Sequence, residues 1–222
     1  YGKVGAMIMA SKAALRIGSG LVSAYVPKCG YTALQTAVPE AMTEVDDEFY
    51  LQFFNFKTNP TAIGIGPGLG THLKTKKGFV EFLKERRSPL VLDADALNII
   101  SEHDEIKGLI PPGSILTPHP REFERLAGSW TDDFEKLKKQ QDFAKRHQCI
   151  LILKGAYTSV TNGDRLYFNS SGNPALATGG SGDVLTGMLT GLLSQGYSPM
   201  NASLLGVYLH GSSADIGVRS EE

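Results

Sequence analysis

The chain has 222 residues, 41% of them hydrophobic and 20% charged, and this combination predicts a single globular domain over residues 1–222. A formal net charge of −1 argues against a nucleic-acid partner, and no apolar run is long enough to span a membrane. Its two cysteines, Cys29 and Cys149, exclude a disulfide framework, and no cysteine or histidine spacing is typical of a metal site. We therefore expect a cytoplasmic protein.

The N-terminal half alternates helical and β-rich segments. A helix is expected over residues 5–17, followed by a strand over 21–26. A strand over 61–65 runs into Gly66-Pro67-Gly68-Leu69-Gly70, and an amphipathic helix follows over 73–87. The next strand, over 90–92, ends at Asp93-Ala94-Asp95-Ala96-Leu97-Asn98. Short strands that alternate with helices are typical of a parallel sheet.

The C-terminal half continues this pattern. A strand over 114–116 ends at Thr117-Pro118-His119-Pro120, and a helix over 134–147 starts after Asp132, with Glu135 placed as in a capping box. A strand over Ile150–Leu153 ends at Lys154, and a hairpin pairs 158–161 with 165–168 around Asn162-Gly163. A last helix carries apolar residues at helical spacing and ends before Gly196. The whole pattern predicts an α/β fold with a central, mostly parallel sheet flanked by helices.

The segment Asn173-Pro174-Ala175-Leu176-Ala177-Thr178-Gly179-Gly180-Ser181-Gly182-Asp183 places small residues before a helix. Backbone amides there, with the positive end of the helix dipole, are suited to bind phosphate, and the predicted cradle is Gly179, Gly180, Ser181 and Gly182. A carboxylate would repel a resting phosphate, so Asp183 makes chemical sense as a general base toward a hydroxyl that attacks it. An N-cap aspartate after a flexible turn is the alternative, and the segment alone leaves both open.

Other polar residues follow predicted parallel strands, and ligands bind beyond such strand ends. Asp93 is expected to face this crevice, whereas Asp95 either faces it or caps the next helix, and Asn98 anchors the loop. His119, held between two prolines, is a candidate ligand contact. The other histidines are assigned to the surface or to packing: His72, His103, His147 and His210.

Two further features allow two interpretations each. The glycines of 66–70 match neither a dinucleotide fingerprint nor a Walker loop, and they form either a tight turn or a close approach to a ligand. Lys154 is either a surface lysine or the partner of a phosphate or nucleotide.

Taken in order, these motifs resemble the ADP- or ATP-dependent NAD(P)H-hydrate dehydratases over nearly the whole chain. Thr-Pro-His-Pro and Asp-Ala-Asp-Ala-Leu-Asn are specific to that family, whereas Gly-Asn-Pro and Gly-Ser-Gly-Asp are shared in looser form with ribokinase-like sugar and vitamin kinases. The resemblance implies a ribokinase-like three-layer fold and the repair of hydrated NADH and NADPH. It also implies ADP or ATP as co-substrate, Mg²⁺ and a homotetramer.

Residue by residue, the resemblance implies that the hydrated NAD(P)H contacts Ala6, Gly70, His119 and the catalytic Asp183. It implies that the adenine nucleotide contacts Lys154, Gly155, Ala156, Tyr157, Thr158 and Gly182. Arg121 and Ala175 stand where the family usually has glycine. The chain begins at Tyr1 without the family's upstream strand and Gly-Ser loop, and we expect it to be trimmed at both ends.

Two other functions remain compatible with the motifs. A ribokinase-like kinase for a vitamin precursor or a sugar would keep Asp183 and the cradle but release a stable phosphoester. A nucleotide-binding regulator without turnover would need only the ligand loops, and an intact Asp183 argues against it.

Overall fold

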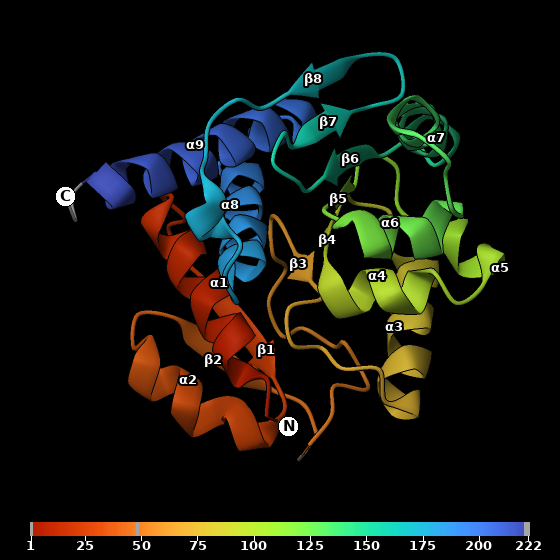
Figure 1. Cartoon of the computed structure of the whole chain (residues 1–222). Coiled ribbons are helices and arrows are strands. Elements are labelled where there is room, and N and C mark those ends of the chain that lie inside the picture. Colours follow the sequence, from red (N-terminus) through yellow and green to blue (C-terminus); the bar gives the residue numbers. More distant parts are fainter. Residues whose placement is uncertain (1, 48, 220–222) are drawn as a thin grey trace.

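The computed structural model describes residues 2–47 and 49–219, and its centre is a six-stranded sheet (Figure 1). The strand order is β3-β4-β5-β6-β7-β8. The parallel part consists of β3 (Gly64–Ile65), β4 (Val91–Leu92), β5 (Ile115–Leu116) and β6 (Ile150–Leu153). The strands β7 (Ser159–Thr161) and β8 (Leu166–Phe168) continue the sheet in antiparallel pairing. The predicted mostly parallel sheet is thus confirmed.

Side chains alternate between the two faces of this sheet, and both faces are buried. Leu92, Leu116 and Leu151 point into one core, and Val91 and Ile115 into the other. The first core is covered by α3 (Leu73–Glu85), α4 (Ala94–Ile100), α6 (Pro120–Ala127) and α7 (Asp133–Arg146), with the short α5 (Asp104–Lys107) beside them. The second is covered by α8 (Ser181–Ser194) and α9 (Pro199–Arg219), and α1 (Val4–Arg16) packs on α8. The result is three layers.

A second, smaller sheet lies beside the first. Its strands β1 (Ser23–Val26) and β2 (Met42–Val45) pair in parallel, and β1 shares an apolar cluster with α1 and with α2 (Tyr31–Ala37), which follows the short turn η1 (Lys28–Gly30). A cavity of about 380 Å³ lies between β1 and β3, and α1 and α8 also line it. None of the described helices is long and apolar enough to cross a membrane.

Several predicted boundaries are wrong by a few residues. The helix expected over 73–87 ends at Glu85. Of the strand expected over 61–65, only Gly64 and Ile65 are in a strand. The hairpin loop has four residues rather than a two-residue turn, because Thr161 pairs with Leu166 and the Asn162 side chain accepts hydrogen bonds from the two amides that follow Gly163. Helix α7 does start after Asp132, whose side chain accepts a hydrogen bond from the Glu135 amide. The Glu135 side chain, however, accepts from the Thr131 amide and not from the Asp132 amide that a capping box requires.

Several elements were not predicted at all, namely α2, β2, α5, α6, α9 and the short turn η2 (Pro174–Leu176). Helix α6 is only eight residues long, so its apolar pattern is too brief to stand out, and α9 is rich in small residues. The prediction about trimmed ends falls on Tyr1 and residues 220–222, which lie outside the described residues, and the single domain stays a prediction.

Candidate functional site

The carboxyl ends of the parallel strands bring four polar or glycine positions to one edge of the sheet. The Asp93 amide donates to the carbonyl of Ile65, at 3.1 Å, so Asp93 lies next to the end of β3. The Thr117 amide donates to the carbonyl of Leu92, at 3.1 Å, and the Lys154 amide donates to the carbonyl of Pro118, at 2.9 Å. Consequently Gly66, Asp93, Thr117 and Lys154 follow one another along that edge, as expected for a crevice at strand ends.

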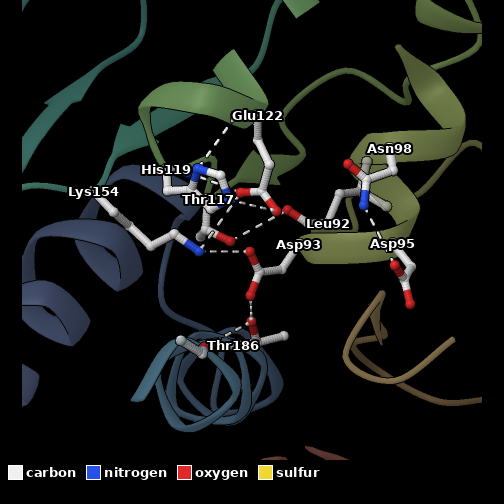
Figure 2. A network of polar contacts seen from close by, with 10 residues as sticks. Leu92, Asp93, Asp95, Asn98, Thr117, His119, Glu122, Lys154 and Thr186 are labelled. Atoms are coloured by element: carbon white, nitrogen blue, oxygen red, sulfur yellow. Dashed lines mark hydrogen bonds and ion pairs between the residues drawn. The ribbon is translucent and has the colours of Figure 1, made fainter. Parts of the chain in front are cut away.

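Two buried carboxylates share one ammonium group at this edge (Figure 2). Lys154 Nζ lies 2.9 Å from Asp93 Oδ1 and 4.0 Å from Glu122 Oε2. The other oxygen of Asp93 accepts a hydrogen bond from Thr186 Oγ1 at 2.8 Å, so α8 holds this carboxylate from below. The Asp93 side chain is 2% exposed and that of Lys154 is 24% exposed, so Lys154 is not a surface lysine.

His119 has a structural role in addition to any ligand contact. It is the N-cap of α6: its Nδ1 accepts from the Glu122 amide at 3.3 Å, and Glu122 Oε2 accepts from the His119 amide at 2.9 Å. Since Nδ1 accepts, the ring proton lies on Nε2. Burial lowers the pKa of His119, Glu122 opposes this shift, and Lys154 reinforces it. The imidazole is therefore neutral at pH 7 and 44% exposed beside the lysine.

The segment predicted to bind phosphate is a helix start without a side-chain cap. Gly180 is the N-cap of α8, and its φ of 93° is a left-handed conformation that favours glycine. No side chain caps this end among the described residues, and of the first amides of α8 that of Ser181 donates to the Thr178 carbonyl at 3.4 Å, so Gly182 and Asp183 offer the donors for a ligand. A Cβ on Gly182 would lie 3.4 Å from Lys154 Nζ and 3.7 Å from Asp93 Oδ2. The cradle thus lies directly against the buried ion pair.

Asp183 is the third residue of α8, so the alternative interpretation as an N-cap is wrong. Its carboxylate is half-buried and accepts no hydrogen bond from the part of the chain that the structure describes. Burial raises the pKa of Asp183 above its ordinary value of 3.8, the negative charge of Asp93 raises it further, and Lys154 opposes both. A carboxylate with this raised pKa and no hydrogen-bond donor among the described residues is suited to accept a proton from a ligand.

Asp95 does not cap α4. Its Oδ2 accepts from the Gly70 amide at 2.8 Å and from Lys3 Nζ at 3.0 Å, and its Oδ1 accepts from Asn98 at 3.3 Å. Asp95 and Asn98 therefore fix Gly70, which the family resemblance assigns to the nicotinamide substrate. Gly66 is needed for packing, because a Cβ there would overlap the carbonyl oxygen of Asp93.

The remaining predicted residues lie around this centre. Ala6 is on α1 and its Cβ lies 3.3 Å from the position that a Cβ on Gly68 would take. Thr158 closes a turn after β6 by donating to the Gly155 carbonyl at 3.1 Å, and Gly155, Ala156 and Tyr157 are exposed within that turn. The two departures from the family pattern, Arg121 and Ala175, are exposed as well.

Glu122 and Thr186 belong to the site although the sequence did not predict them there. Glu122 follows His119 by three residues, the spacing of a capping box, and this signal could have found both the carboxylate and α6. Thr186 lies one turn after Asp183 on α8, and only the packing of α8 under β4 brings it to Asp93.

Comparison with known proteins gives consistent results. The sequence profile described as NAD(P)H-hydrate dehydratase matches residues 1–220. The chain is 35% identical to the ADP-dependent (S)-NAD(P)H-hydrate dehydratase of Lactiplantibacillus plantarum, over 95% of this chain and 75% of that protein. It is 36% identical to the bifunctional NAD(P)H-hydrate repair enzyme of Moorella thermoacetica, over 98% of this chain but only 43% of that protein. The chain therefore spans less than half of this bifunctional relative.

Solved structures agree with these relatives. The ADP/ATP-dependent NAD(P)H-hydrate dehydratase of Bacillus subtilis, co-crystallised with ATP and Mg²⁺, superposes with a TM-score of 0.79 at 31% identity, covering 98% of this chain and 77% of that one. A ribokinase-like superfamily protein of Enterococcus faecalis superposes with a TM-score of 0.82 at 26% identity, covering 97% and 75%. The predicted ribokinase-like fold is confirmed.

Proposed function

Because the chain belongs to the NAD(P)H-hydrate dehydratase family, we propose that it converts hydrated NADH and NADPH back to NADH and NADPH and consumes ADP or ATP. The observation that carries this proposal is the placement of Asp183. It stands in the first turn of an uncapped helix, with a raised pKa and no partner among the described residues, beside Lys154. A general base at a phosphate site is the arrangement that phosphoryl transfer to a hydroxyl requires.

The chemistry follows from the substrate. Hydrated NADH carries a hydroxyl on the ring carbon next to the nitrogen, and hydroxide is a poor leaving group at neutral pH. Asp183 takes the hydroxyl proton while the oxygen attacks the terminal phosphoryl group of the nucleotide, which releases the shortened nucleotide. The C–O bond then breaks, the nitrogen lone pair replaces it, phosphate leaves, and loss of a proton from the adjacent carbon restores the ring double bond.

Charge that develops on the transferred group is stabilised from two sides. The amides of Gly179, Gly180 and Gly182 are proposed to donate to it, whereas the Ser181 amide is engaged by the Thr178 carbonyl, and Lys154 supplies a positive charge beside Gly182. Mg²⁺ would bind mainly through the nucleotide phosphates, because it commonly needs only one or two protein carboxylates, and the described residues contain no group of three or more potential metal ligands. When bound, it screens the nucleotide phosphates.

The two ligands are assigned to different groups of residues around the cradle. The exposed turn at Gly155–Thr158 follows Lys154 and receives the adenine nucleotide. Gly70, His119 and Ala6 receive the hydrated nicotinamide. Asp95 supports this assignment, since it fixes the Gly70 amide.

His119→Ala is expected to weaken hydrated NADH binding about fivefold while it leaves ADP affinity unchanged, since a lost hydrogen bond from a neutral ring costs about 1 kcal/mol. Calorimetric titration with each ligand measures both affinities. His119→Asn is the matched control, because asparagine keeps the N-cap of α6 and removes the ring. Equal losses for both ligands in both variants would show that the crevice is assigned wrongly.

Gly182→Ala is expected to lower the maximal rate at least tenfold while stability stays equal or rises by up to about 1 kcal/mol, because alanine is the better helix former and Gly182 has no left-handed φ. The new methyl group would contact Lys154 at the cradle. Melting temperature and single-turnover rate, measured on one sample, give both quantities. Gly217→Ala on α9, where a Cβ meets nothing within 4 Å, is the control. A Gly182→Ala enzyme with full rate contradicts the cradle.

The decisive experiment for the function is incubation with hydrated NADH and either ADP or ATP. Recovery of the near-ultraviolet absorbance of the reduced ring, with one phosphate released per ring, supports the dehydratase. A phosphoester product from a vitamin precursor or a sugar, with flat absorbance, identifies a kinase instead. Nucleotide binding without either product identifies a regulator.

Two broader assignments accompany this function. The substrates are reduced nicotinamide and adenine nucleotides, and Cys29 and Cys149 are free thiols, which together support a reducing cytoplasm. The homotetramer that the resemblance implies is proposed here as well, and light scattering of the purified protein tests it.

A further inference from the structure

The loop before the cradle lies along one helix that sequence analysis did not predict. Asp215 of α9 accepts two hydrogen bonds from this loop: its Oδ2 from the Gly172 amide at 2.8 Å, and its Oδ1 from Asn173 Nδ2 at 3.0 Å. We propose that Asp215 is a positioning residue that sets the phosphate cradle for phosphoryl transfer. This inference rests on the proposed function, and it assigns a role to a residue 32 positions beyond Asp183.

A short series of contacts leads from Asp215 to the cradle. Asn173, once held by Asp215, caps the turn η2 by accepting from the Ala175 amide at 2.9 Å. The last residue of that turn, Leu176, accepts from Ser181 Oγ at 2.7 Å. Ser181 is the first residue of α8, so the position of Asp215 is transmitted to the residue that opens the helix.

Further contacts hold the same loop against α9. Ser171 Oγ donates to the carbonyl of Tyr208 at 3.0 Å. A Cβ on Gly211 would lie within 2.6 Å of the Ser171 carbonyl oxygen, so glycine permits this close approach. His210 contacts the backbone of Ser181 at the far end of the loop. Helix α9 therefore supports the loop at both of its ends.

The free segment between these anchors explains why positioning matters. Residues 177–180 contain two glycines and are largely exposed. Backbone hydrogen bonds hold Ala177 and Gly180, so the conformation is least restricted between them. Donors that stabilise a transition state must be held close to one geometry, and a displacement of about 1 Å costs on the order of a hundredfold in rate. Fixing both ends of the segment limits the amides to the productive arrangement.

A reciprocal exchange tests the proposal on the full chain. In Asp215→Asn, one acceptor oxygen remains for two donors, so one of the two hydrogen bonds is lost, and in Asn173→Asp two carboxylates face each other. Each single change therefore disrupts the contact. The double variant restores it, because the new amide at position 215 accepts from Gly172 and donates to the new carboxylate at position 173, which still caps η2. We expect kcat to fall at least about tenfold in each single variant and to return within about threefold of wild type in the double variant.

Two further readouts separate positioning from simple stability. The KM for hydrated NADH should change by less than about threefold in each single variant, since the loss acts on the transition state. Amide hydrogen exchange of a peptide covering 172–183 should rise in the single variants and return in the double variant, without any substrate. Gly211→Ala should reproduce the single-variant effect, and Gly217→Ala on the same helix should not.

The outcomes are distinct. Single variants with wild-type kcat and exchange overturn the positioning role, and so does a double variant that stays as slow as the singles although its melting temperature is restored. A wild-type protein without turnover refutes the proposed function, while the exchange measurement still decides whether Asp215 orders the loop.

Discussion

Asp183→Asn is expected to lower turnover by about two to four orders of magnitude, because it removes the proposed general base and keeps the shape of the side chain. Affinity for ADP or ATP should be unchanged or improved, since the carboxylate lies in the cradle where it repels phosphate. Single-turnover kinetics and calorimetry on one preparation measure the two effects. Asp133→Asn is a suitable control, because Asp133 also lies in the first turn of a helix but is exposed on α7. Near-normal turnover in Asp183→Asn would show that Asp183 is not a general base and serves only the start of the helix.

The pH dependence gives an independent check on the same residue. A general base works only when it is deprotonated, and burial and the charge of Asp93 raise the pKa of Asp183 above 3.8. Activity should therefore be lost as pH falls through a value above 3.8, and the acidic limb of the kcat/KM profile lies there. This limb should be absent from the residual activity of Asp183→Asn. An unchanged limb would assign the titration to another group.

Lys154→Met is expected to lower the free energy of unfolding by about 3 kcal/mol and to abolish detectable nucleotide binding. The first effect arises because Asp93 is left as a buried carboxylate without its cation, and breaking such a pair is strongly destabilising. The second arises because the phosphates lose their positive partner. Urea unfolding and calorimetry measure the two effects. Lys145→Met breaks an exposed ion pair with Asp164 and should change stability by less than about 0.5 kcal/mol.

Adding Asp93→Asn to Lys154→Met separates these two causes. Asparagine keeps the acceptor for Thr186 and removes the unpaired charge, so most of the lost stability should return. Nucleotide binding should stay lost, since no cation is restored. If stability does not return, the broken ion pair is not the cause of the lost stability. If nucleotide binding recovers, Lys154 does not bind the nucleotide.

The sequence by itself determined the features that depend on local order. Strand β6 (Ile150–Leu153) is predicted to the residue, because a continuous apolar run bounded by polar residues is typical of a buried parallel strand. The start of α8 was predicted because glycines before an amphipathic helix are typical of a phosphate-binding helix N-terminus. This pattern lies within a few residues of the sequence. The order of the motifs also identified the family, since that order is a property of the sequence alone.

Only the tertiary structure decided which side chains meet. Asp95 had two local interpretations, and its contact with the Gly70 amide, 25 residues away, depends on how β3 and β4 pair. Lys154 was ambiguous until the sheet placed it between Asp93 and Glu122. Asp215 gave no local signal, because the loop residues that donate to it lie more than forty residues earlier. Periodicity and turn chemistry act over a few residues, whereas these contacts arise from the register of parallel strands and the packing of helices on them.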